Sequence, residues 1–177
     1  MDSILVVGSV ALDSVKTPEG ESVDALGGSA VYFSLSAKQF VPVGLVGVVG
    51  EDFPEAHRKL LAARGVDMAG LKTAKGKTFR WAGRFSKAMD KAKTLDTQLN
   101  VFADFRPKIP AAFRDSRFVF LANGSPQTQL AVLEPVAHPD FVLADSMILW
   151  ILTERAPLLD LMQRVDGLIL NNHEAVQ

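Results

Sequence analysis

Five short, almost wholly apolar runs are spaced along the chain, and they limit the fold more than any other feature. They cover residues 4–7, 43–49, 118–121, 141–144 and 167–170. Uninterrupted apolar runs of this length are typical of strands buried on both faces, as in parallel sheets. Stretches with helical patterning, such as residues 29–40 and 52–65, separate the runs. This alternation predicts an α/β fold with a mostly parallel sheet flanked by helices.

The pattern changes between about residues 71 and 102. Residues 78–85 and 94–101 alternate polar and apolar side chains on either side of a charged turn at 86–93, which is typical of antiparallel strands. We expect them to pair with an extended excursion at about residues 10–26, so that a small antiparallel sheet forms a lid or a dimer surface. One face of residues 78–85 is aromatic and the other basic: Phe79, Trp81 and Phe85 against Arg80 and Arg84. Packing within that small sheet is the simplest role for most of the aromatic side chains.

Composition narrows the functional classes. The 177 residues are 48% hydrophobic and 22% charged, which suits one good core with at most a small appendage. A net charge of −1 and the lack of a basic block argue against nucleic acid or an anionic membrane as the main partner. The chain contains no cysteine, which excludes disulfides, a thiolate nucleophile and cysteine metal sites. With neither a signal peptide pattern nor a bilayer-length apolar run, we expect a cytoplasmic protein.

A glycine pair precedes the first helical stretch. Gly27 and Gly28 can adopt positive φ angles and allow another molecule to approach the backbone closely. Ser29 is the predicted N-cap, which would leave free N–H groups of the first helical turn facing a hydroxyl or an anion. A tight strand-to-helix turn with close packing explains the same residues, and both interpretations remain open here.

A second helix start is predicted at residues 52–55. Asp52 and Glu55 have the spacing of a capping box, with Asp52 as the N-cap and Glu55 reaching back to it. Gly65 is the expected C-terminal stop of this helix.

Polar residues follow several of the predicted strands. Asp13 comes shortly after the first strand, and Asn123, Asp145 and Asn171 follow three later ones. The carboxyl ends of parallel strands line one edge of a sheet, where α/β proteins bind ligands. Strand ends are also polar simply because they are exposed, so only convergence in space would indicate a site. The glycines of a dinucleotide-binding fingerprint are missing after Gly8, which disfavours a Rossmann cofactor site.

Four segments, taken in order, resemble the ribokinase-like sugar kinases, the phosphofructokinase-B family, which also includes adenosine kinases. The resemblance covers the whole chain and includes a strand-rich lid at the expected place. The four segments are Gly8-Ser9 with Asp13, then Gly27-Gly28-Ser29-Ala30, then residues 46–53, similar to the family's Gly-x-Asp segment, and finally residues 168–175, similar to its Asn-x-x-Glu motif.

The resemblance implies transfer of the γ-phosphoryl group of ATP, with Mg²⁺, to a hydroxymethyl group of a sugar or nucleoside. Asp13 would hold substrate hydroxyls, and the inserted sheet would close over the substrate to exclude water. The resemblance implies these further roles: substrate binding by Gly27, Gly28, Ser29 and Asn123, and water-mediated placement of phosphate and Mg²⁺, without direct metal ligation, by Asp145, Asn171 and Glu174.

The sequence also departs from the family. The family's catalytic aspartate lies in a Gly-Ala-Gly-Asp segment that does not occur before Gln177. The resemblance therefore implies the N-terminal part of a larger kinase, with the base, the anion hole and the ATP-binding part beyond Gln177, and an inactive 177-residue chain. Tyr32 stands where many members have a substrate-contacting asparagine, which leaves the substrate open. The alternative is a non-catalytic sugar-binding or dimerisation module, with a homodimer formed through the lid.

Overall fold

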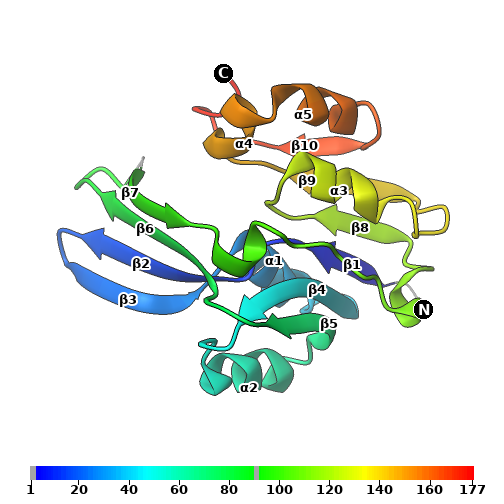
Figure 1. Ribbon diagram of the computed structural model, residues 1–177, viewed down its shortest axis with the longest axis horizontal. Helices are drawn as coiled ribbons and strands as arrows, with labels where there is room; N and C mark the ends of the chain where they lie inside the picture. The colour runs from blue at the N-terminus through cyan, green and yellow to red at the C-terminus, as the bar shows by residue number, and fades with distance from the viewer. Residues whose placement is uncertain (1–2, 90–91) are drawn as a thin grey trace.

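The computed structural model describes residues 3–89 and 92–177, which form an α/β body with a smaller sheet projecting from it (Figure 1). All strand pairs in the six-stranded sheet are parallel, and the strand order is β10-β9-β8-β1-β4-β5. The predicted α/β class with a mostly parallel sheet is confirmed. The strands of this large sheet are β1 (Ile4–Val7), β4 (Val43–Gly50), β5 (Asp67–Ala74), β8 (Phe118–Leu121), β9 (Phe141–Asp145) and β10 (Gly167–Ile169).

Helices cover both faces of the large sheet. Helices α1 (Ser29–Ala37) and α2 (Glu55–Ala63) contribute to one apolar cluster, in which Val31 and Leu61 pack with Val6 and Leu45 of the strands. The opposite face is covered by α3 (Pro126–Val132), α4 (Ile148–Thr153) and α5 (Arg155–Met162), together with the 3₁₀ turns η1 (Asn100–Phe102) and η2 (Ala111–Phe113). None of the helices in the described ranges is long and apolar enough to cross a membrane.

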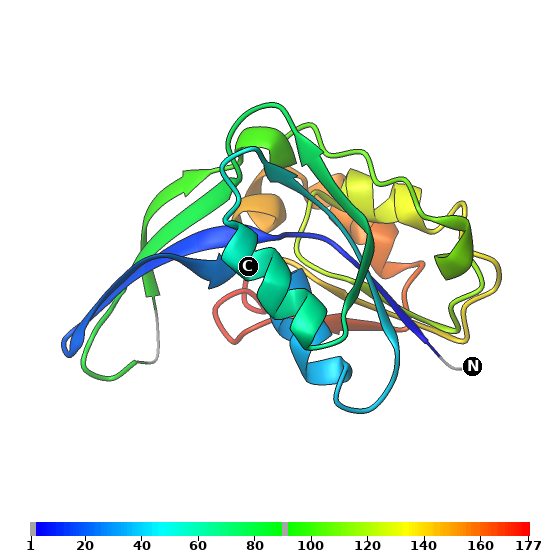
Figure 2. The same ribbon diagram turned by 90° about the horizontal axis from the view of Figure 1, so that it is seen from below.

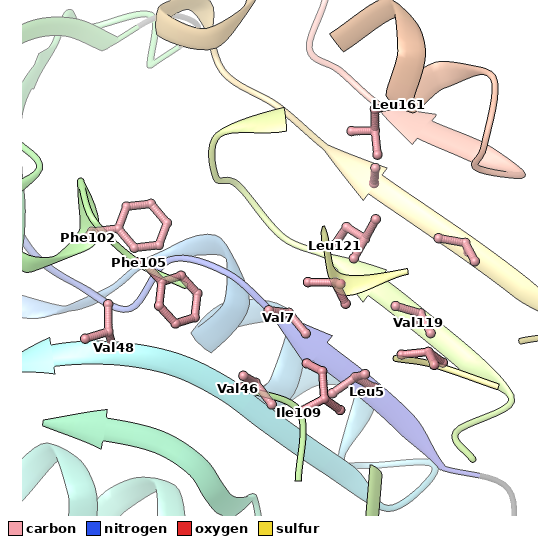
Figure 3. Close-up of a cluster of buried hydrophobic side chains, with 14 of the residues drawn as sticks. Leu5, Val7, Val46, Val48, Phe102, Phe105, Ile109, Val119, Leu121 and Leu161 are labelled. Atoms are coloured by element: carbon pink, nitrogen blue, oxygen red, sulfur yellow. The ribbon is translucent and has the colours of Figure 1, made fainter. Parts of the chain in front are cut away.

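The continuous apolar runs form strands because the sheet is buried on both sides. Leu5 and Val6, which are neighbours on β1, are both fully buried but belong to the clusters on opposite faces of the sheet. Figure 3 shows the Leu5 side of this core, where Val7, Val46 and Phe105 also pack. Burial on both faces therefore leaves the carboxyl edge of the sheet as the place where polar side chains can gather.

The small sheet has the order β3-β2-β6-β7 and extends from one end of the body (Figure 2). Its strands are β2 (Ala11–Thr17), β3 (Gly20–Gly27), β6 (Phe79–Phe85) and β7 (Ala92–Gln98). The predicted pairing of the two strand-rich segments is confirmed, because β2 lies beside β6. Part of the predicted turn at 86–93, residues 90–91, lies outside the described residues.

Two details of the predicted lid are wrong. Residues 71–74 belong to β5, which pairs with β4 in the large sheet, so the lid strands begin at Phe79 and not at about residue 71. Strand β5 lies at the sheet edge, where an amphipathic pattern resembles that of a lid strand. The small sheet is also not wholly antiparallel: β2–β3 and β6–β7 are antiparallel hairpins, but the central pair β2–β6 is parallel.

Asp52 connects the large sheet to the small one and does not cap α2. The N-cap residue of α2 is Pro54, without a side-chain hydrogen bond, so the predicted capping box is wrong. The Asp52 carboxylate instead accepts hydrogen bonds from the N–H and the hydroxyl of Thr78 and from Arg80, each at 2.7 Å. Burial acts to raise the pKa of Asp52, but the Thr78 hydrogen bonds and the Arg80 charge outweigh it and hold that pKa below its usual value.

Asp52→Ala is expected to lower the free energy of unfolding at pH 7 by roughly 1–3 kcal/mol, because it leaves the backbone N–H of buried Thr78 without an acceptor. Asp52→Asn keeps an acceptor and should cost less. Since the folded-state pKa is depressed, the stabilisation is present above pH 3.8 and is lost as pH falls through the folded pKa. Urea unfolding of both variants at pH 7 and pH 3 measures this, and an alanine effect that is equally large at both pH values would contradict the assignment.

Candidate functional site

A cavity of about 540 Å³ lies between the carboxyl edge of the large sheet and the small sheet. Strands β2, β6 and β7 of the small sheet, the start of α1 and the loops that follow β1, β8, β9 and β10 of the large sheet contribute to its wall. Six of the eight residues predicted for a binding site line this cavity: Asp13, Gly28, Ser29, Asn123, Asn171 and Glu174. The predicted residues Gly27 and Asp145 do not line the cavity themselves. Gly27 contacts Asp13, and Asp145 is hydrogen-bonded to Ser29, and both of these partners line the cavity. The structure therefore brings the polar strand ends to one place.

Asp13 provides a carboxylate at this cavity. Burial raises the pKa of Asp13 to about 6, although the N–H of Gly28 donates a hydrogen bond that acts in the opposite direction. The carboxylate lies directly on the backbone of Gly27, where a Cβ atom would meet the Asp13 Oδ2 atom at 2.0 Å. Gly28 has a φ of 95° and would place a Cβ atom 2.3 Å from the carbonyl oxygen of Ser9. Glycine is therefore required at position 27 for Asp13 to hold this orientation and at position 28 for the backbone turn beside Ser9.

The start of α1 is built differently from the sequence prediction. Gly28 is the N-cap residue, and Ser29 is the first helical residue, so the predicted Ser29 cap is wrong. The Ser29 N–H donates to the hydroxyl of Ser9 at 3.2 Å and the Ala30 N–H to its carbonyl, also at 3.2 Å. The N–H groups that were expected to face a ligand are thus occupied within the protein. Ser29 nevertheless lines the cavity, and its side-chain Oγ accepts a hydrogen bond from the Asn123 N–H at 2.8 Å.

Asp145 is partly buried and accepts a hydrogen bond from Ser29. Burial raises the pKa of Asp145 to about 7; a hydrogen bond from Ser29 acts against the increase, and the charge of Glu174 adds to it. The Asp145 Oδ1 atom is buried without a hydrogen-bond partner. The end of β9 therefore carries a carboxyl group that protonates near neutral pH and has one oxygen free to accept a further bond.

Asn171 and Glu174 form a turn at the cavity edge after β10. The Glu174 Oε2 atom accepts from the Asn171 N–H at 2.9 Å, and the Asn171 Oδ1 atom accepts from the N–H groups of His173 and Glu174. These bonds fix the turn and hold both side chains at the cavity.

Asp145→Asn is expected to raise the free energy of unfolding at pH 8 by roughly 1–3 kcal/mol, because it removes a buried charge and keeps an acceptor for Ser29. A raised folded-state pKa means that the ionised form costs stability. The gain should thus be largest above pH 7, shrink as pH falls, and vanish below 3.8, where the group is protonated in both states. Urea unfolding between pH 3 and pH 8 measures this, and a gain that does not change with pH would contradict it.

Aromatic residues of the cavity were not predicted as site residues. Trp81 and Phe85 of β6 and Tyr32 of α1 line it. Phe79 of β6 lines it too, but its side chain is buried and stacks on Phe102. The period-two pattern placed Phe79, Trp81 and Phe85 on one face, but it could not show that this face covers a cavity. Burial, and then the charge of Asp13, raises the pKa of Tyr32, whose hydroxyl donates to the Leu26 carbonyl at 3.3 Å.

The fold agrees with those of known proteins that the chain resembles. The nucleoside kinase of Methanocaldococcus jannaschii, an archaeal member of the ribokinase family, superposes over 99% of this chain with a TM-score of 0.73 at 18% identity. Ribokinase of Thermotoga maritima superposes over 98% with a TM-score of 0.71 at 16% identity. The nucleoside kinase of Burkholderia thailandensis, in complex with inosine, gives a TM-score of 0.75 at 14% identity over 98% of the chain. The chain therefore has the ribokinase-like fold.

At the level of sequence, the chain is similar to the cytidine kinase of Thermococcus kodakarensis, with 27% identity over 135 residues, or 75% of the chain. No protein-family model matches. The chain spans 48% of the length of that cytidine kinase, and 62%, 61% and 61% of the three solved structures in the order given above.

Proposed function

We propose that this chain supplies the substrate-binding half of an ATP-dependent kinase that phosphorylates a hydroxymethyl group of a sugar or nucleoside. The observation that carries the proposal is the Asp13 carboxylate, which is seated on the Gly27–Gly28 turn and faces the cavity between the two sheets. The ribokinase-like fold and the kinase relatives support it.

In this proposal Asp13 accepts hydrogen bonds from substrate hydroxyls, and these bonds are charge-assisted because the carboxylate is ionised. Asn123 and Asn171 line the same cavity beyond the ends of β8 and β10. The Asn123 amide is held by Trp150 and Met147, so in this proposal the N–H groups of the Asn171 amide donate to a further hydroxyl. The small sheet, which carries Asp13 on β2, forms the wall across from these asparagines, and its closure over the substrate would keep water away from the transferred phosphoryl group. Binding and orientation are therefore the contributions assigned to this part of the chain.

ATP would supply the γ-phosphoryl group and Mg²⁺ the neutralisation of its charge. Among the residues that the structure describes, no cluster of three or more His, Cys, Asp or Glu side chains could hold a metal directly. The free Asp145 Oδ1 atom and the Glu174 carboxylate fit a water-mediated role beside the phosphates. We assign them that role, together with Asn171, and assign no direct metal ligand.

Isothermal titration calorimetry with matched analogues tests the proposed binding role. We expect a hydroxylated sugar or nucleoside to bind with one site per chain, and its dideoxy analogue to bind at least about tenfold more weakly, since each charge-assisted hydrogen bond contributes roughly 1.5–3 kcal/mol. Equal affinities for the hydroxylated and dideoxy compounds, or no binding by any compound of a sugar and nucleoside panel, would contradict the proposal.

A further inference from the structure

We propose, on the basis of the function above, that the substrate is a nucleoside and that its base stacks on the indole of Trp81 while its sugar hydroxyls contact Asp13. The proposal rests on three features of the small sheet: how the indole is held, where it lies relative to Asp13, and which other side chains border it.

The indole of Trp81 is held along the surface of its own strand. A Cβ atom at Gly83, two residues further along β6, would lie 2.1 Å from the Trp81 Cη2 atom, so one side of the ring covers the Gly83 backbone. The indole Nε1 atom donates to the hydroxyl of Thr94 on the neighbouring strand β7 at 3.3 Å. Trp81 also lines the cavity, and therefore presents its remaining surface there. An aromatic ring fixed in this way is a preorganised stacking platform.

Trp81 and Asp13 lie side by side on the adjacent strands β6 and β2. They are register partners in the parallel β2–β6 pair, at the strand spacing of about 5 Å. Both line the cavity, so a carboxylate and an aromatic ring project side by side from one sheet face. A nucleoside matches this pair of side chains, because its polar diol, which would contact the carboxylate, is joined to a flat aromatic base, which would stack on the indole. A free monosaccharide would engage Asp13 and leave the indole uncovered.

Further aromatic side chains lie at the same cavity as Trp81. Phe85 of β6 and Tyr32 of α1 border the same cavity, and Tyr32 is 60% exposed. Stacking of a base on an aromatic side chain contributes about one to two orders of magnitude in affinity and tolerates every base. The platform therefore selects nucleosides over sugars without fixing which base is bound.

Tryptophan fluorescence and calorimetry together test the proposal on the full chain. Cytidine, adenosine and free ribose are titrated into the wild type, Trp81→Phe and Trp81→Ala. Nucleosides should quench the wild-type emission and bind about 10- to 100-fold more tightly than ribose. Trp81→Ala should lose most of this advantage and leave the ribose affinity within about threefold, whereas Trp81→Phe should retain most of it. Trp81→Phe should also remove most of the quenching, because Trp150, which is buried and does not line this cavity, then remains as the only tryptophan.

Gly83→Ala provides a test that leaves the indole in the chain. Its Cβ atom forces the ring off the strand, so the nucleoside affinity should fall as it does for Trp81→Ala. Gly20→Ala is the matched control, because a Cβ atom there meets nothing within 4 Å in the same sheet. If Trp81→Ala fails to fold, Trp81→Phe and Gly83→Ala still test whether the base stacks on the indole.

The outcomes separate this inference from the proposed function. Ribose that binds as tightly as the nucleosides, or variants that weaken ribose and nucleosides equally, would overturn the nucleoside assignment and leave the kinase proposal standing. Absence of binding by any of these compounds and by the wider sugar panel would overturn both.

Discussion

Asp13→Ala is expected to weaken binding of the hydroxylated substrate by about one to two orders of magnitude or more, the largest effect on affinity that we expect from a single substitution. The carboxylate would accept charge-assisted hydrogen bonds, each contributing roughly 1.5–3 kcal/mol. Asp13→Asn should cost less because its amide oxygen still accepts. Calorimetry of both variants measures the affinities. Thermal unfolding at pH 7 should not occur at a lower temperature, because burial raises the pKa of Asp13 to about 6 and its ionised carboxylate therefore does not stabilise the fold.

The same carboxylate should make binding depend on pH. Because the pKa of Asp13 is about 6 and the ionised form is the acceptor, affinity should be constant above pH 7 and fall about tenfold for each unit below pH 6. Asp13→Asn should remove this dependence. Equal affinities of the wild type and Asp13→Ala for whichever compound binds would show that Asp13 takes no part in binding.

The second large effect concerns catalysis. The 177-residue chain is expected to bind substrate without measurable ATP-dependent phosphorylation, because the Gly-Ala-Gly-Asp segment with the family's base and anion hole does not occur in it. A base contributes about 10²–10⁴-fold in rate, and each donor to a developing negative charge about 10²–10³-fold. A coupled ADP-release assay on a preparation whose binding competence has been shown by calorimetry measures this. Turnover by the wild-type chain that is lost in Asp13→Ala would contradict the expectation, because the loss would show that the activity belongs to this chain and not to a contaminating kinase.

The α/β architecture was predictable because its strands are buried on both faces. Leu5 and Val6 point to opposite sides of the sheet and both are fully buried, which forces the uninterrupted apolar run that the sequence shows. The boundary of the small sheet was not predictable in the same way. Strand β5 has a mixed pattern at the edge of the large sheet, and local periodicity does not indicate which sheet a half-buried strand joins.

The polar part of the candidate site followed from position along the chain. Asn123 and Asn171 come after parallel strands, whose carboxyl ends must meet at one edge. The role of Asp52 could not be found in this way, because its spacing to Glu55 fits a capping box while its actual partner, Thr78, is 26 residues away. Trp81 was likewise assigned to packing, since a period of two gives the face of a side chain but not what that face covers.

Mapping of ligand-induced amide shifts by NMR tests the central claim most directly, which is that the cavity between the two sheets binds the substrate. A ¹⁵N-labelled chain is titrated with cytidine, adenosine and ribose. The proposed site predicts that the largest shifts occur at Asp13, Gly28 and Ser29, with the Trp81 indole N–H responding to nucleosides, while Gly65 at the far end of α2 stays unchanged. Shifts centred away from the cavity, or saturating binding that leaves Gly28 and Ser29 unperturbed, would contradict it.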